Sequence, residues 1–203
     1  MSGFFSRGFT RRRRVPEELA DRLPPGQYYE TGFPVLSAGP TPRVDWDAWT
    51  FEIDGLVARP RTWTSADFDG LAFETVPCDV HCVTKWSKLD TSFGGVSMDA
   101  FLDAVEPQGA FALVRSAGGY TTNLALDDLI GGKAWIVTQH EGEPLAPEHG
   151  GPARLLVPHL YFWKSAKWVT GMGVLERDQL GFWERNGYHR RGDPWREQRY
   201  RGD

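Results

Sequence analysis

The chain has 203 residues, of which 40% are hydrophobic and 25% are charged, and its formal net charge is -4. This length and composition indicate a globular protein with one sizeable core, and they exclude a disordered chain. The acidic balance argues against nucleic acid as the main partner, and two cysteines cannot form a disulfide framework. Nine tryptophans and twelve phenylalanines favour a loop-rich fold, because each ring buries a large area.

The first 14 residues carry Arg7 and the arginine run 11–14 with no acidic residue, so we expect a basic, mobile N-terminal arm. A paired-arginine export signal needs an apolar stretch after it, and residues 15–22 are too polar for that. No apolar run approaches the length that spans a membrane. We therefore expect a cytoplasmic protein without membrane insertion, in which residues 15–203 form a single domain.

Residues 15–47 contain prolines and glycines too often for regular structure. The stretch also contains apolar groups to bury, among them Tyr28, Tyr29 and Phe33. It is too long for a simple linker. We expect an ordered segment that is laid over the domain and lines a site.

Several short strands follow, with few helices between them. Ser97 is placed to cap a short helix with its apolar face formed by Met98, Phe101, Leu102 and Val105, and residues 126–130 suit one or two helical turns. Apolar and alternating patterns predict strands at residues 49–57, 73–83 (broken by Pro77), 111–115, 134–138, 154–157 and 167–176. This pattern indicates an α+β domain built on β-sheet.

The two cysteines, Cys78 and Cys82, lie in one short stretch with His81, Lys85 and Trp86. A thiol can be a nucleophile, a metal ligand or an apolar filler, and its neighbours decide which. No G-x-S-x-G elbow is present, which argues against a serine hydrolase. The glycine doublets also lack the spacing of a phosphate-binding loop.

A zinc site is one alternative for this stretch. Cys78, His81 and Cys82 offer suitable ligands, and His140, His149 or His159 would complete a set for a zinc-dependent hydrolase. If residues 78–82 form a strand, however, the two cysteines face one side and His81 the other. That geometry does not favour one ion bound by all three.

A second chemical feature is the turn at residues 149–168, where Arg154, Lys164 and Lys167 lie among aromatic residues. Two glycines and two prolines set its backbone path. Such a turn can present cations and backbone N–H groups to an anion such as phosphate. A solvated basic loop with an aromatic underside explains the same residues, and the pattern alone leaves both interpretations open.

Two sequence runs carry a resemblance to a known family. The run C-V-T-K-W-S at residues 82–87 and the run G-G-P-A-R-L-L-V-P-H-L-Y-F-W-K-S-A-K-W at residues 150–168 together resemble the molybdopterin-binding domain of the sulfite oxidase family, in particular its short, single-domain bacterial members. Residues 50–57 and 181–189 support the match, which extends from about Tyr29 onward. The resemblance implies a mixed, β-sheet-rich fold and a molybdenum-dependent oxidoreductase that transfers an oxygen atom on a small substrate, an S-oxide, an N-oxide or a sulfite-like anion.

The resemblance also implies roles for individual residues. Cys82 matches the protein thiolate that binds molybdenum, which agrees with the preference of soft sulfur ligands for such a metal. Cys78 matches no ligand position and is read as structural. The positions that match contacts to the molybdopterin and its phosphate are Tyr29, Glu30, Ser116, His149, Arg154, Ser165, Ala166 and Lys167.

For the substrate pocket the candidates are His81, Lys85, Arg115 and Tyr120. No pair of arginines follows Cys82, so the sulfite-binding arginine cluster of the larger relatives is not evident. No haem-binding domain precedes the matched region, so electrons are expected to pass to a separate haem, flavin or iron–sulfur protein. A non-catalytic module that binds an anion or a partner is the remaining alternative, and the cysteine at position 82 argues against it.

Overall fold

Two β-sheets organise residues 17–203, the part of the chain that the computed structural model describes; the arm predicted at residues 1–14 lies outside it. The first sheet has the strand order β1-β5-β8-β10, with β4 paired to β5 and β9 paired to β8. Its strands are β1 (Tyr28–Tyr29), β4 (Phe73–His81), β5 (Trp86–Ser97), β8 (Trp135–His140), β9 (Glu143–Pro144) and β10 (Arg154–Leu156). Only the β1–β5 pairing in this sheet is parallel.

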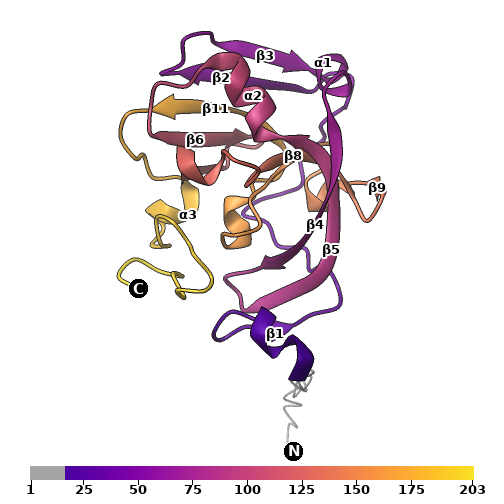
Figure 1. The fold of residues 1–203 in the computed structure, drawn as a ribbon, viewed down its shortest axis with the longest axis vertical. Helices are drawn as coiled ribbons and strands as arrows, with labels where there is room; N and C mark the ends of the chain where they lie inside the picture. Colours follow the sequence, from indigo (N-terminus) through magenta and orange to yellow (C-terminus); the bar gives the residue numbers. More distant parts are fainter. Residues whose placement is uncertain (1–16) are drawn as a thin grey trace, which may run out of the picture.

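The second sheet has the order β3-β2-β11-β6-β7. Its strands are β2 (Thr50–Gly55), β3 (Arg61–Thr64), β6 (Phe111–Ser116), β7 (Thr121–Ala125) and β11 (Val169–Leu175). The central β2–β11 pairing is parallel and the others are antiparallel. In Figure 1 this sheet lies at one end of the molecule, and the long β4–β5 hairpin runs from it down one side. The mixed, sheet-rich α+β fold predicted from the sequence is confirmed.

The helices are short. They are the 3-10 helices η1 (Glu17–Arg22), η2 (Leu126–Asp128), η3 (Pro147–His149) and η4 (Phe162–Lys164), and the α-helices α1 (Ser65–Asp69), α2 (Met98–Val105) and α3 (Phe182–Arg185). Helix α2 begins where predicted, because the Ser97 hydroxyl accepts a hydrogen bond from the backbone N–H of Asp99. The four apolar residues predicted for its inner face are all buried. No helix among residues 17–203 is long and apolar enough to cross a membrane.

Strand β5 is the main element that the sequence patterns missed. Its 12 residues include Lys88 and Asp90, and the doublet Gly94-Gly95 interrupts the apolar alternation. The strand forms nonetheless, because it is paired along both edges, with β4 along its length and with β8 at its C-terminal half. Pairing of this kind depends on distant segments and leaves little local signal.

Gly95 permits the close approach of β5 to β8. A Cβ atom added there would overlap the carbonyl oxygen of Ile136 and the Cα atom of Val137, both of which are backbone atoms. We expect Gly95→Ala to lower the free energy of unfolding by about 3 kcal/mol, since overpacking in a rigid sheet forces the backbone to shift. Chemical denaturation measures this change.

Gly39→Ala is the matched control, because nothing lies within 4 Å of a Cβ added at that position. The control is expected to change the free energy of unfolding by less than about 1 kcal/mol. Equal destabilisation by both substitutions would contradict the assigned strand pairing.

Candidate active site

Cys82 lies in the turn of residues 82–85, which joins β4 to β5. The backbone N–H of Lys85 donates to the carbonyl of Cys82 (2.9 Å), and the N–H of Cys82 donates to the carbonyl of Trp86 (2.8 Å). Lys85 adopts a left-handed conformation with φ 80°, which closes the turn. The hairpin therefore fixes the backbone that carries the Cys82 sulfur.

Side chains from both ends of the described chain hold this turn. Gln27 donates from Nε2 to the carbonyl of Cys82 (3.0 Å), and Arg199 donates from Nη1 to the carbonyl of Val83 (2.9 Å). The Thr84 hydroxyl donates to the Cys82 Sγ atom at 3.1 Å. Burial raises the pKa of the Cys82 thiol, and the Thr84 hydrogen bond opposes that rise.

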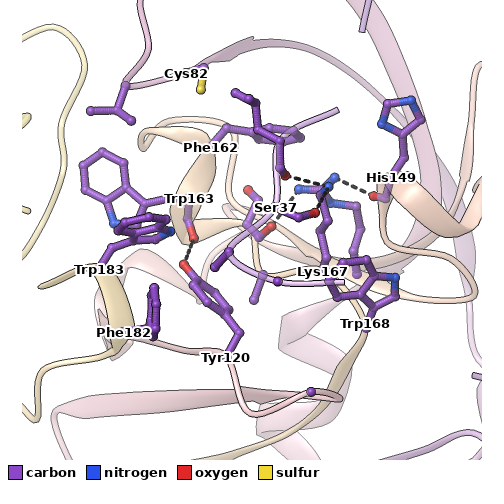
Figure 2. A pocket seen from close by; sticks show the side chains of 18 of the residues that line it. Ser37, Cys82, Tyr120, His149, Phe162, Trp163, Lys167, Trp168, Phe182 and Trp183 are labelled. Carbon is purple, nitrogen blue, oxygen red and sulfur yellow. Dashed lines mark hydrogen bonds between the residues drawn. The ribbon is translucent and has the colours of Figure 1, made fainter. Parts of the chain in front are cut away.

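A cavity of about 510 Å³ opens beside Cys82, which is a volume typical of cofactor and ligand sites. Four parts of the chain line it besides the Cys82 turn: the irregular segment from Phe33 to Pro42, the turn of residues 117–120, the turn of residues 149–168, and the C-terminal residues Phe182, Trp183 and Tyr188. In Figure 2, Cys82, Trp163 and Trp183 lie on one side of the cavity, and His149, Lys167 and Trp168 lie on the other.

The side of the cavity away from Cys82 is cationic. The Arg154 guanidinium is 1% exposed and donates to the carbonyls of His149 and Ser165, both at 2.7 Å. Its plane also lies over the Phe162 ring, 4.1 Å from the centroid. Lys167 Nζ donates to the carbonyl of Leu36 (2.8 Å). Within residues 17–203, neither cation has a carboxylate partner, so the site carries positive charge without compensation.

Burial and the nearby Arg154 lower the pKa of Lys167 to about 8. His149 stacks on Phe33 with the ring centroids 4.0 Å apart. Burial and the Lys167 charge lower the pKa of His149, so the imidazole is neutral at neutral pH. Its buried Nδ1 atom has no hydrogen-bond partner among the described residues. This atom and the two cations are groups that a polar, anionic ligand would satisfy.

The Cys82 side of the cavity is aromatic. Trp183 stacks on Tyr188 with centroids 4.9 Å apart, and Trp163 packs edge-on against Tyr188 at 5.0 Å. The Tyr120 hydroxyl donates to the Trp163 carbonyl at 2.7 Å. Desolvation raises the pKa of Tyr120 well above its usual value, so the phenol keeps its proton.

A buried ion pair supports this aromatic wall from behind. Lys164 and Glu184 both have side-chain exposures of 0%, and their charged atoms are 2.7 Å apart. Glu184 also accepts hydrogen bonds from Trp163 Nε1 (2.9 Å) and from the Thr122 hydroxyl (3.1 Å). The pair thus ties η4, α3 and β7 together and fixes the Trp163 indole.

The structure brings together seven side chains that the sequence singled out: Cys82, Tyr120, His149, Arg154, Ser165, Ala166 and Lys167 all line the cavity. It does not bring the others there. Arg115 lies on the second sheet and pairs with Asp54 (3.0 Å) and Glu52 (3.3 Å), so its charge is already compensated. Lys85 closes the Cys82 turn on the exposed side.

The remaining candidates also have structural surroundings. Tyr29 and Glu30 run along β5, and the Glu30 carboxylate caps its own turn by accepting from the N–H of Gly32. Ser116 is buried and does not line the cavity, although the next four residues, 117–120, do. His81 is buried with Nδ1 2.8 Å from the Ser87 hydroxyl.

The zinc alternative gains no support. Residues 17–203 contain no cluster of three or more His, Cys, Asp or Glu side chains placed to hold a metal ion. Cys82 lines the cavity, and neither Cys78 nor His81 does. Burial raises the pKa of Cys78 to about 12, which is typical of an inert thiol.

Sequence patterns missed Trp163, Phe182, Trp183 and Tyr188 as pocket residues. The sequence shows that these stretches are rich in aromatic residues, but aromatic side chains are equally common in a hydrophobic core, so they do not indicate a pocket. Only the chain path shows that α3 returns to the Cys82 turn.

The family described as the oxidoreductase molybdopterin binding domain matches residues 38–183. The chain belongs to this family. The resemblance drawn from residues 82–87 and 150–168 is thereby confirmed, and the protein is an oxidoreductase of a molybdopterin-binding family.

Similar proteins agree with the assignment. The chain is 42% identical over 189 residues to YuiH, an oxidoreductase of Bacillus subtilis (strain 168), covering 92% of this chain and 96% of that protein. It is 28% identical over 178 residues to the NADH nitrate reductase 2 of Phaseolus vulgaris, where the match spans 71% of this chain but only 20% of that protein. The sulfane dehydrogenase SoxCD from Paracoccus pantotrophus shares the fold, with a TM-score of 0.61, 18% identity, and coverage of 87% of this chain and 57% of that chain.

Removing the lysine of the buried ion pair tests the support of the aromatic wall. We expect Lys164→Met to lower the free energy of unfolding by about 3–5 kcal/mol, because Glu184 would keep a buried charge without a partner. Denaturant unfolding measures this loss, and tryptophan emission should report a loosened Trp163.

The control is Arg59→Met, which breaks the exposed pair between Arg59 and Glu106. Exposed pairs contribute no more than about 1 kcal/mol. A Lys164→Met protein as stable as this control would show that the buried pair does not hold the wall.

Proposed function

We propose that this cavity holds the molybdenum–pyranopterin group and that the protein transfers an oxygen atom to or from a small, neutral S-oxide or N-oxide. One observation carries the proposal: a single cavity joins the Cys82 sulfur to two cations, the buried Arg154 and the half-buried Lys167, that lack carboxylate partners among residues 17–203. A soft ligand at one side and an anion site at the other suit a metal-bearing cofactor with a phosphate tail.

Each part of the cavity has a role in this proposal. Cys82 would supply a thiolate ligand to molybdenum, and the Thr84 hydroxyl would hold that sulfur in place by its 3.1 Å hydrogen bond. The Arg154 and Lys167 side chains would bind the phosphate, and Nδ1 of His149 would bond to the pterin or its linker. Ser165 positions this loop, because its hydroxyl accepts from the N–H of Val157 (2.9 Å).

When bound, the cofactor supplies the two-electron chemistry, and the protein supplies orientation and exclusion of water. The indoles of Trp163 and Trp183 and the ring of Tyr188 wall the Cys82 side, so water is displaced there. The phenol of Tyr120 stays protonated and donates a hydrogen bond to the Trp163 carbonyl, which fixes the position of the aromatic wall.

The distribution of charge favours a neutral substrate. The lysine and arginine side chains that line the cavity are Arg154 and Lys167, and both belong to the proposed phosphate site. The aromatic side offers rings and no cation to a substrate. A sulfite dianion would lose its hydration there without a charged partner, whereas a neutral S-oxide or N-oxide would pack against the rings.

The metal content of protein purified from a host that makes the cofactor tests the proposal. We expect about one molybdenum per chain, and we expect Cys82→Ser to lose turnover of dimethyl sulfoxide or trimethylamine N-oxide with a reduced dye. Cys78→Ser is the matched control, since Cys78 does not line the cavity, and it should keep metal and turnover.

Molybdenum far below one per chain in a well-folded protein would contradict the proposal and would favour a non-catalytic binding module. Full activity in the Cys82→Ser variant would remove Cys82 from the proposed role while leaving the cofactor assignment in place.

The anion site has a pH dependence that can be measured without the cofactor. Because the pKa of Lys167 is lowered to about 8, this side chain loses its charge as pH rises through that value. In cofactor-free protein, the dissociation constant for sulfate should rise about fourfold between pH 6.5 and 8.5, following the protonated fraction of Lys167. Calorimetric titration measures it.

Lys167→Met should bind sulfate weakly and without this pH dependence. Lys133→Met, which changes an exposed lysine outside this cavity, should behave as the wild type does. A wild-type affinity that stays constant over this pH range would show that Lys167 does not bind the anion.

A further inference from the structure

The C-terminal segment, residues 181–203, forms an ordered face next to the cavity. Its backbone closes on itself, with the N–H of His189 donating to the carbonyl of Arg199 (3.1 Å) and the N–H of Arg201 donating to the carbonyl of Gly187 (2.8 Å). Arg199 anchors it to the Cys82 turn through the Val83 carbonyl. In Figure 1 the segment lies opposite the lower end of the β4–β5 hairpin.

This segment is basic on an otherwise acidic domain. It contains six arginines and four acidic residues, whereas residues 15–180 contain twelve lysines and arginines against 23 acidic residues. Two of its arginines, Arg190 and Arg191, pair with Asp178 and Asp128. The exposed residues Arg185, Arg196 and Arg201 have no carboxylate partner within residues 17–203.

Exposed aromatic rings accompany these arginines. Trp195 is 51% exposed and Tyr200 is 52% exposed. The Arg201 guanidinium donates to the carbonyl of Glu184, which places it beside Arg185. The exposed, unpaired arginines and the two rings of this segment are called here the basic aromatic face: Arg185, Trp195, Arg196, Tyr200 and Arg201.

Contacting rings join this face to the cavity. Tyr200 packs edge-on against Tyr188 at 5.6 Å, Tyr188 stacks on Trp183 at 4.9 Å, and both inner rings line the cavity with Cys82. Trp195 also packs against His81, the residue before Cys82, with centroids 6.2 Å apart. A partner seated on the face would therefore lie close to the proposed metal site.

We propose that the basic aromatic face docks a small acidic protein that carries one electron at a time; this inference rests on the proposed function. In the reducing direction, two carrier molecules each lose one electron, and the substrate oxide takes up both electrons and two protons to give the deoxygenated product and water. The oxidising direction is the reverse. Charge complementarity would steer the encounter, and the exposed rings would form the packed centre of the contact.

An anionic membrane is the competing occupant for arginines beside exposed aromatic rings. Interfacial binding typically uses a long amphipathic helix, and the helix in this segment, α3, has four residues. The acidic body of the domain would also be repelled by such a surface. The compact face suits a small protein better.

Binding to the purified holoenzyme tests the docking. The probes are an acidic [2Fe–2S] ferredoxin, a basic cytochrome c and vesicles of anionic phosphatidylglycerol. We expect ferredoxin to bind at low ionic strength and to be released at about 0.15 M salt. Arg185→Glu/Arg196→Glu should weaken this binding about tenfold or more.

The matched control is Arg59→Glu/Arg61→Glu, which makes the same change in net charge. Arg61 is the first residue of β3, Arg59 lies two residues before it, and both side chains are exposed. It should alter ferredoxin binding by no more than about twofold. The proposal is overturned if ferredoxin does not bind, if the control weakens binding equally, or if vesicles or cytochrome c bind through the same arginines.

Turnover separates this proposal from the proposed function. In the Arg185→Glu/Arg196→Glu variant the ratio of ferredoxin-driven to dye-driven turnover should fall about tenfold. In the Arg59→Glu/Arg61→Glu control the same ratio should stay unchanged. An unchanged ratio with intact dye-driven turnover overturns the docking face alone. Absence of dye-driven turnover and of molybdenum overturns the proposed function, while the binding measurement still decides the docking.

Discussion

A buried guanidinium without an anionic partner is the constraint on which the pocket depends. Arg154 is 1% exposed, and its hydrogen bonds go to the carbonyls of His149 and Ser165. Carbonyl dipoles and the Phe162 ring offset part of the desolvation of this charge, but within residues 17–203 no carboxylate does. The turn of residues 149–168 folds around that cation, and an anionic ligand would complete its surroundings.

The two sheets bring the other half of the site to this cation. Strand β10 carries Arg154 in the first sheet, and β11 follows the same turn into the second sheet, so the turn bridges both. The β4–β5 hairpin places Cys82 at the far side of the cavity. Its turn is held by Gln27 and Arg199, which lie near opposite ends of the described chain. The geometry of the sulfur therefore depends on the whole domain.

Local chemistry explains what the sequence could predict. Ser97 marked the start of α2, and two short runs marked both sides of the pocket, because caps, turns and cofactor contacts leave compact signals. Strand β5 and helix α3 depend on distant partners, so patterns missed them. Arg115 is the instructive case: spacing along the chain could not reveal that Asp54, sixty-one residues away, already pairs with it.

The central claim is that the Cys82 sulfur and the two cations, Arg154 and Lys167, serve one bound cofactor. Molybdenum K-edge X-ray absorption on the purified protein tests it most directly, because it counts sulfur neighbours of the metal. The account predicts one sulfur fewer in the Cys82→Ser protein than in the wild type, and no change in the Cys78→Ser protein. An identical sulfur count in the wild type and in Cys82→Ser would contradict it.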